Sequence, residues 1–209
     1  MEVIMAEEGI CQIYPVLIGL MGCGKSSIGK LLAAELGITF LDLDHYIVEK
    51  AGRTIPEIFA EVGEEGFRDL ETKALREVLG TPVVLASGGG VVMRAENRAM
   101  LAAHAPVIWL KSSLHFLAGR IQGDENRPLT AGRDALTVLQ QLAEIRYPYY
   151  TQCADYILHR GEMNKAQSLH AVIEYLRQWK FEHSEGFANA PRHDAAALLA
   201  QDDTTILDE

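Results

Sequence analysis

A glycine-rich segment near the N-terminus places the strongest constraint on this chain. Residues 19–26 read GLMGCGKS, which matches the phosphate-loop pattern G-x-x-x-x-G-K-[ST]. Glycines allow the backbone to turn tightly, so that successive N–H groups point at a polyphosphate. In such a loop Lys25 would reach the β- and γ-phosphates, and the Ser26 hydroxyl would ligate Mg²⁺. The segment therefore predicts that the chain binds a nucleoside triphosphate.

The residues on either side of this loop fit a strand–loop–helix unit. The apolar residues 16–18 precede it, and four apolar residues follow it at the i, i+3, i+4 and i+8 spacing of one helix face: Ile28, Leu31, Leu32 and Leu36. The loop would then lie at a helix N-terminus, where the helix dipole also favours phosphate. A chance glycine-rich turn is the alternative, and these flanking patterns argue against it.

The rest of the chain predicts an α/β fold. With 209 residues and 48% hydrophobic residues, the chain suits one domain with a sizeable core. Apolar runs predict five strands at about 15–20, 38–42, 82–87, 106–111 and 154–158, with helical patterns between them. Alternating strands and helices predict a parallel sheet with helices on both faces. Ligands of such sheets bind at the carboxyl ends of the strands.

Charge and cysteine usage narrow the class of protein. The formal net charge of −10 argues against broad nucleic-acid binding, which needs a basic face. Three cysteines (Cys11, Cys23 and Cys153) show no C-x-x-C spacing, as is usual in a reducing compartment. The first residues, MEVIMAEEG, are unlike a signal peptide, and no apolar run is long enough to cross a bilayer. We expect a cytoplasmic monomer that binds neither nucleic acid nor membrane.

Two carboxylates follow the second predicted strand. In a strand alternate residues share a face, so Asp42 and Asp44 would both point toward the nucleotide cleft. The alternative is that they cap the next helix, because Asp is a favourable N-cap residue. Ser87 stands where a phosphate-loop enzyme often has an acid at the end of a strand, so Asp42 is the candidate to support Mg²⁺.

An arginine and a glycine triplet follow. Arg68 and Glu71 are three residues apart and can pair on one helix face; the alternative is a solvated surface pair that contributes little. A predicted strand then runs into three glycines, which let backbone N–H groups approach a ligand closely: Gly88, Gly89 and Gly90. The alternative for this triplet is a flexible turn.

Three further arginines are candidates for contacts with charged ligands. Residues 123–132 (GDENRPLTAG) are typical of a lid, and Arg127 in it could close onto a transferring phosphoryl group, with Arg120 seven residues earlier. Arg146 begins the segment RYPYY, which we expect to end a helix, and it could bind a carboxylate in a bidentate fork. The alternative for Arg146 is a surface cation at a helix C-terminus.

In this order and spacing the motifs resemble those of the shikimate kinases. The set comprises GLMGCGKS, D-x-D, F-R-x-x-E, G-G-G, R-P-L and R-x-x-Y-Y, and it spans residues 14–180. The resemblance implies a nucleoside-monophosphate-kinase-like fold with a five-stranded parallel sheet in the order 2-3-1-4-5. It also implies transfer of the γ-phosphoryl group of ATP to the 3-hydroxyl of shikimate, a step toward chorismate and the aromatic amino acids.

The resemblance also implies roles for particular residues. Catalysis would involve Lys25, Asp44 and Arg127, and Mg²⁺ would be held directly by Ser26 and through water by Asp42. ATP would contact Gly22, Cys23, Gly24, Lys25, Ser26, Ser27, Arg120 and Arg127. Shikimate would contact Asp44, Arg68, Gly88, Gly89, Gly90 and Arg146. Adenine would contact residues in the segment 158–161, but the resemblance does not fix which of them.

The expected organisation has three parts. Residues 1–12 would be a short extension, 13–180 a phosphate-loop kinase domain, and 181–209 an acidic flexible tail with a short helix near 194–201. Within the domain, the shikimate-binding region would span about 42–71 and the lid about 120–134. A gluconate kinase and a nucleoside monophosphate kinase are alternative enzymes. A degenerate kinase reused as a binding module is a third, but it would be expected to have lost Lys25, Asp44 or Arg127.

Overall fold

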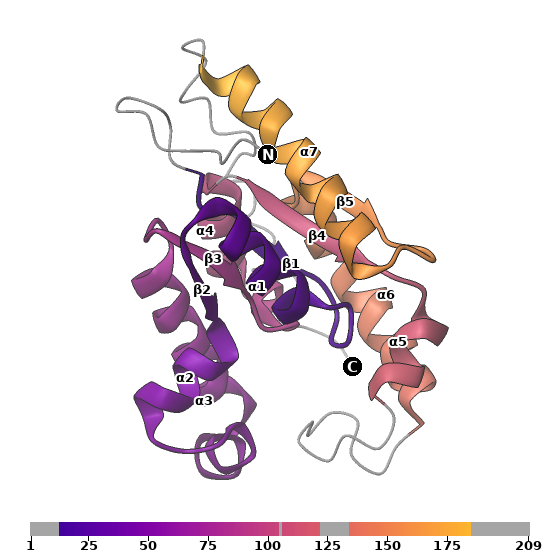
Figure 1. The fold of residues 1–209 in the computed structure, drawn as a ribbon. Coiled ribbons are helices and arrows are strands. Elements are labelled where there is room, and N and C mark those ends of the chain that lie inside the picture. Colours follow the sequence, from indigo (N-terminus) through magenta and orange to yellow (C-terminus); the bar gives the residue numbers. More distant parts are fainter. Residues whose placement is uncertain (1–12, 105, 122–133, 185–209) are drawn as a thin grey trace.

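A five-stranded parallel sheet forms the centre of the molecule (Figure 1). The computed structural model describes residues 13–104, 106–121 and 134–184. The strand order is β2-β3-β1-β4-β5, which confirms the predicted fold class. The strands are β1 (Val16–Ile18), β2 (Thr39–Asp42), β3 (Val83–Ala86), β4 (Val107–Lys111) and β5 (Tyr156–His159).

Helices cover both faces of this sheet. Figure 1 shows α1 and α7 on one face and α4 and α6 on the other, while α2 and α3 lie together beyond β2. Among the described residues no helix is both long and apolar enough to span a membrane. The helical elements are α1 (Lys25–Leu36), α2 (Leu43–Ala51), α3 (Ile55–Val78), η1 (Val91–Met93), α4 (Ala95–Ala103), α5 (Leu114–Ile121), α6 (Ala135–Cys153) and α7 (Lys165–Ser184).

Helix α1 packs on the sheet through a face slightly different from the predicted one. Ile28 and Leu32 are fully buried as expected, but Leu31 is 40% exposed. Gly29 and Ala33 take its place in the interface. A Cβ atom at Gly29 would lie only 2.5 Å from Cε2 of Phe40 on β2. The small residues therefore let α1 approach the sheet more closely than a stripe of leucines would.

The parallel strands bring chemically active segments to one edge. The phosphate loop follows β1, Asp42 ends β2, the glycine triplet 88–90 follows β3, and Arg160 follows β5. All of these strands run in the same direction, so these segments share the carboxyl edge of the sheet.

One local prediction about secondary structure was wrong. The strand β2 ends at Asp42, and Asp44 lies in the first turn of α2, so strand alternation does not explain how the two carboxylates are placed. Helix α6 includes Pro148 and ends at Cys153, close to the helix end that the segment RYPYY predicts.

Several sequence expectations concern the ends of the domain and the lid. Helix α7 reaches Ser184, so the boundary expected after residue 180 falls inside a helix. The extension 1–12, Arg127 with most of the lid, and the segment 194–201 lie outside the described residues.

A kink divides α3 into two segments. The first begins at Thr54, whose hydroxyl accepts from the backbone N–H of Glu57 in a capping box. At Gly63 the backbone has φ 71° and ψ −174°, a conformation essentially restricted to glycine. A Cβ atom at Gly66 would lie 2.5 Å from Cβ of Val62 across the kink. The kink therefore depends on two glycines, and a new helical segment starts at Glu64.

We expect the substitution Gly63→Ala to destabilise the protein by about 1–3 kcal/mol, because alanine is strained in this backbone conformation. The measurement is the free energy of unfolding in urea. Gly119→Ala is the matched control: open space surrounds the position of its Cβ on α5, so this change should be neutral or stabilise by up to about 1 kcal/mol. Equal stabilities of the two variants would contradict the strain at Gly63.

Candidate active site

The phosphate loop has the backbone that its sequence predicts. Gly19, Gly22 and Gly24 all have positive φ, at 136°, 79° and 98°. Lys25 starts α1, and its Nζ donates to the carbonyl oxygens of Gly19 at 2.8 Å and Leu20 at 3.2 Å. The ammonium group is thus held at the mouth of the loop, beside the backbone that would surround a polyphosphate.

A cavity of about 260 Å³ adjoins this loop. It brings together residues from the carboxyl ends of β1, β2 and β3, as expected for a ligand site in a parallel sheet. It is lined by Met21, Gly22, Gly24, Lys25, Ser26, Ser27, Asp42, Asp44, Ser87, Gly89 and Arg120.

Ser26 and Asp42 bring two side-chain oxygens together in this cavity. The Ser26 hydroxyl donates to Oδ2 of Asp42 at 2.7 Å. Hydroxyl and carboxylate oxygens, completed by water and phosphate oxygens, suit Mg²⁺. Ser87 is a poor ligand, because it is buried and its hydroxyl donates to the carbonyl of Leu17 at 3.1 Å. The donor set therefore fits a magnesium ion carried by a nucleotide.

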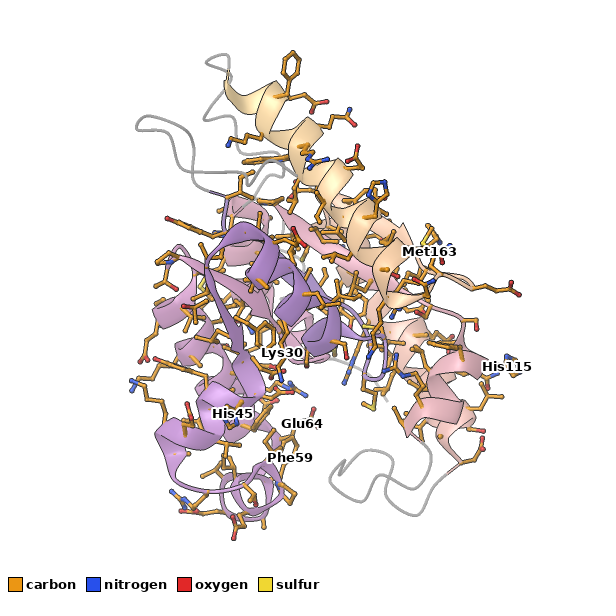
Figure 2. All side chains as sticks on the ribbon, viewed as in Figure 1. Lys30, His45, Phe59, Glu64, His115 and Met163 are labelled. Carbon is orange, nitrogen blue, oxygen red and sulfur yellow. The ribbon has the colours of Figure 1, made fainter. Side chains whose placement is uncertain are left out.

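A second hollow, of about 480 Å³, lies along β2 and meets the first at Ser26 and Asp42. Lys30 of α1 and His45 of α2, both labelled in Figure 2, contribute to its lining. Ser26 and Asp42 therefore lie where two hollows join, and both side chains can be reached from solvent.

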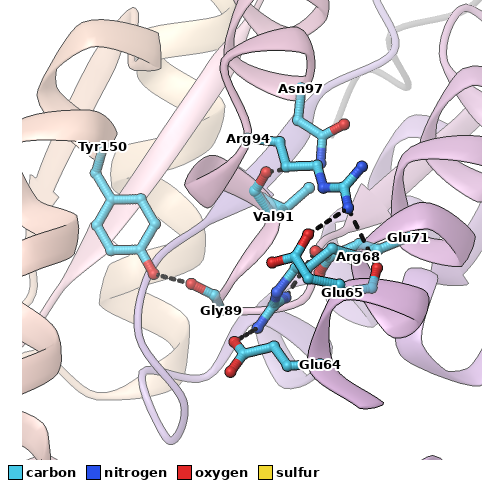
Figure 3. A network of polar contacts seen from close by, with 9 residues as sticks. All are labelled: Glu64, Glu65, Arg68, Glu71, Gly89, Val91, Arg94, Asn97 and Tyr150. Atoms are coloured by element: carbon cyan, nitrogen blue, oxygen red, sulfur yellow. Dashed lines mark hydrogen bonds and ion pairs between the residues drawn. The ribbon is translucent and has the colours of Figure 1, made fainter. Parts of the chain in front are cut away.

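On the other side of Asp44, α3 carries a buried ion pair. Nη1 of Arg68 donates to Oε2 of Glu71 at 2.7 Å (Figure 3). Arg68 is 5% exposed and Glu71 is fully buried. The alternative of a solvated surface pair is therefore wrong. Nη2 of Arg68 also donates to Oε1 of Glu64 at 3.1 Å.

The two members of this pair respond differently to burial. Burial acts to lower the pKa of Arg68, but the carboxylates of Glu71 and Glu64 offset it, so the pKa of the guanidinium is raised and it stays charged. Burial raises the pKa of Glu71, an effect that Arg68 opposes and that the nearby charge of Asp44 strengthens. Arg68 therefore keeps its positive charge. Of the two groups, Glu71 is the one whose charged form is disfavoured by burial overall.

The glycine triplet makes room for charged side chains. A Cβ at Gly88 would lie 2.6 Å from Oδ1 of Asp44 and 2.8 Å from Oε1 of Glu71. A Cβ at Gly90 would lie 2.6 Å from Cζ of Arg68. The sequence analysis assigned these glycines only to close approach of a ligand; the structure adds that the first and third glycines make room for the side chains of Asp44, Glu71 and Arg68.

Arg146 reaches the middle of this triplet from α6. It is 4% exposed, so the alternative of a surface cation is wrong. A Cβ at Gly89 would lie 3.4 Å from its Nη1. Its buried Nε has no hydrogen-bond partner among the described residues. A buried cation with an unused donor is typical of a site that receives an anion.

Tyr150, one helical turn after Arg146, holds the triplet in place. Its hydroxyl donates to the carbonyl oxygen of Gly89 at 2.5 Å (Figure 3). Burial raises the pKa of this phenol above its usual range, so it remains a neutral donor. Its ring packs against Trp109 on β4, with centroids 5.4 Å apart. The tyrosine-rich segment is therefore part of the core beneath the site.

The sequence analysis did not select Arg160. This residue follows β5, and its Nη1 donates to the carbonyl oxygen of Cys23 in the phosphate loop at 2.5 Å. Its Nε donates to the hydroxyl of Ser168 on α7 at 3.0 Å. Burial and the nearby charge of Arg120 lower its pKa, although the contact with Cys23 opposes them. The sequence signal that could have identified Arg160 was its position directly after the last parallel strand, within the segment 158–161.

We expect Arg160→Met to weaken binding of a non-hydrolysable ATP analogue by about tenfold, which corresponds to the loss of one charge-assisted hydrogen bond. Calorimetric titration measures this affinity. Arg177→Met, which removes an exposed arginine of the same α7 region paired with Glu174, should bind the analogue like the unmodified protein. Unchanged affinity in both variants would mean that Arg160 does not support the loop.

Comparison with known proteins agrees with this site. The family model described as "Shikimate kinase" matches residues 21–177. A shikimate kinase of Caulobacter vibrioides is 44% identical over 164 residues, which is 78% of this chain and 82% of that protein. A shikimate kinase of Synechococcus elongatus is 49% identical over 161 residues, which is 77% of this chain and 84% of that protein.

Solved structures agree with the same assignment. The shikimate kinase of Acinetobacter baumannii in complex with shikimate aligns with a TM-score of 0.73 and 36% identity, covering 81% of this chain and 94% of that chain. The enzyme from Bacteroides thetaiotaomicron aligns with a TM-score of 0.73 and 32% identity, covering 79% of this chain and 98% of that chain. The chain belongs to the shikimate kinase family.

Proposed function

We propose that this chain transfers the γ-phosphoryl group of ATP to the 3-hydroxyl of shikimate, giving shikimate 3-phosphate and ADP. As a member of the shikimate kinase family it is an ATP-dependent kinase that acts on shikimate. One observation carries the assignment of its acid pocket. Two buried arginines, Arg68 and Arg146, meet at the glycine triplet that also borders Asp44, beside the phosphate loop.

The two arginines bind the carboxylate of the acid. A guanidinium group presents its N–H donors in a fixed plane that matches the two oxygens of a carboxylate. Arg68 and Arg146 come from different helices and approach the triplet at Gly90 and Gly89. Because both side chains are almost fully buried, their rotamers are fixed before the substrate arrives, which lowers the entropic cost of binding.

The phosphate loop and its neighbours bind the nucleotide. Its backbone N–H groups and Lys25 would surround the phosphates, Ser26 would hold Mg²⁺ directly, and Asp42, which accepts the hydrogen bond of Ser26, would hold the ion through a water molecule. When bound, Mg²⁺ neutralises the charge that develops on the transferring phosphoryl group. Arg120 borders the same cavity, and Arg127, outside the described residues, would approach the phosphates from the lid.

Asp44 aligns the attacking hydroxyl. Its carboxylate lies where Gly88 leaves room for it and lines the cavity that contains Lys25. From there it accepts the hydrogen bond of the 3-hydroxyl and takes its proton as the phosphoryl group is transferred. The chain mainly positions the two substrates and stabilises charge, as phosphoryl transfer requires.

The remaining assignments are part of the same proposal. The kinase domain spans about residues 13–180, with a shikimate-binding region at about 42–71 and a lid at about 120–134. The enzyme works as a cytoplasmic monomer on two small substrates, ATP and shikimate, with no nucleic acid or membrane partner. Its net charge of −10 supports the absence of a nucleic-acid partner.

A coupled ADP-release assay with Mg²⁺-ATP tests the function. Shikimate, gluconate and adenosine monophosphate are supplied separately to the purified protein. We expect ADP release that depends on shikimate alone. ADP release with gluconate or with adenosine monophosphate instead would contradict the assignment of the substrate pocket to shikimate. If none of the three substrates causes ADP release, in protein that still binds ATP, the result would favour the alternative of a degenerate kinase reused as a binding module.

Two substitutions separate the roles of the pocket residues. Asp44→Asn should keep ATP binding and lower kcat by about 10²–10⁴, the range expected for loss of a general base. Arg68→Ala should raise the KM for shikimate far more than the KM for ATP. Arg94→Ala is the control for Arg68, because Arg94 pairs with the exposed carboxylates of Glu65 and Asp69. Equal effects of Arg68→Ala on both KM values would contradict the assignment.

A further inference from the structure

The donors of Arg68 are divided unequally among their partners. Nη1 donates to Glu71, Nη2 donates to Glu64, and the buried Nε has no hydrogen-bond partner among the described residues (Figure 3). A carboxylate that binds an arginine in a fork needs two adjacent N–H donors. The edge formed by Nε and Nη2 offers such a pair, but Glu64 already takes one of its two nitrogens.

The two glutamates differ in how firmly they are held. The side chain of Glu71 is 1% exposed, whereas that of Glu64 is 56% exposed. Glu71 is enclosed between α3 and Gly88, and moving it would leave a buried arginine uncompensated. Glu64 makes one contact at 3.1 Å and can turn into solvent at little cost. Glu71 is therefore a permanent partner of Arg68, and Glu64 is a replaceable one.

The charges around the triplet also favour replacement of Glu64. Two cations, Arg68 and Arg146, face three carboxylates, those of Asp44, Glu64 and Glu71. Adding the carboxylate of a substrate would bring a fourth negative group into a largely buried site, where like charges repel strongly. If Glu64 leaves as the substrate carboxylate arrives, the charge of the site does not change.

The kink in α3 places Glu64 for this contact. Because the helix restarts after Gly63, Glu64 opens the second segment and lies four residues before Arg68, the spacing at which helical side chains meet. In Figure 2 the side chain of Glu64 lies on the side of α3 turned toward the body of the molecule. The next residue, Glu65, turns away and pairs with Arg94 at 2.9 Å.

We infer that Glu64 competes with the substrate carboxylate for the Nη2 edge of Arg68 and thereby sets the affinity for the acid. The inference rests on the proposed function and deepens it: shikimate displaces Glu64 into solvent when it binds, while Glu71 remains in place. The loss of the contact between Arg68 and Glu64 offsets part of the free energy that the acid gains on binding. Glu64 is thus a specificity-determining residue, because only a ligand with its own carboxylate can replace the ion pair between Arg68 and Glu64.

The test is the substitution Glu64→Gln, with Glu65→Gln as the matched control. Both changes remove one negative charge from the same helical turn, but only the first affects Arg68. We expect Glu64→Gln to lower the KM and the calorimetric Kd for shikimate by about two- to fivefold, the range of an ion pair with one exposed partner. Its kcat and its KM for ATP should stay within about twofold, and Glu65→Gln should match the unmodified enzyme.

Glu64→Ala provides a second variant in which no amide oxygen can replace the carboxylate at Nη2. It should also bind shikimate more tightly than the unmodified enzyme. An unchanged or raised KM for shikimate in both Glu64 variants would overturn the inference, and a raised KM would identify Glu64 as a support of Arg68. The unmodified enzyme reports separately on the proposed function, because failure to phosphorylate shikimate at all would remove that function whatever the variants do.

Discussion

A cation buried at the end of a parallel sheet is the constraint on which much of this structure depends. Arg68 cannot be taken out of water alone, so α3 carries Glu71 one turn later to neutralise it. Glu71 in turn needs space beside the strand β3, and Gly88 supplies that space by having no side chain. The same pair is close enough to Asp44 for their charges to interact. Helix α3, the glycine triplet and the start of α2 are therefore one electrostatic unit.

The two halves of the site are built by different physical means. The nucleotide half uses backbone conformation: glycines with positive φ, a helix N-terminus and a lysine held by carbonyl oxygens. The acid half uses buried side chains whose charges nearly cancel one another. Backbone cradles accept any polyphosphate, whereas a set of fixed charges accepts only an acid of suitable shape. Substrate selection therefore lies mainly with the second half.

Much of the fold and of the site could be predicted from the sequence because short motifs carry their own geometry. The phosphate loop predicted β1, α1 and the edge at which ligands bind, the alternating pattern predicted a parallel sheet, and the resemblance implied the strand order. The sequence argument for Asp44 was wrong because it assumed that the strand continues to this residue. No local pattern marks the change from strand to helix at residue 43. Arg146 was selected as a candidate carboxylate ligand, but its burial depends on how α6 packs, which no local pattern shows. Arg160 was missed because a hydrogen bond across 137 positions leaves no local pattern.

That long-range contact gives the C-terminal helix a part in nucleotide chemistry. Arg160 joins the carbonyl of Cys23 to the hydroxyl of Ser168, so the phosphate loop and α7 share one buried guanidinium. Thermodynamic linkage between two sites is reciprocal. Any free-energy coupling that this guanidinium transmits between a bound nucleotide and α7 therefore acts equally in both directions. Helix α7 thereby forms part of the support of a loop that precedes it by more than a hundred residues in the sequence.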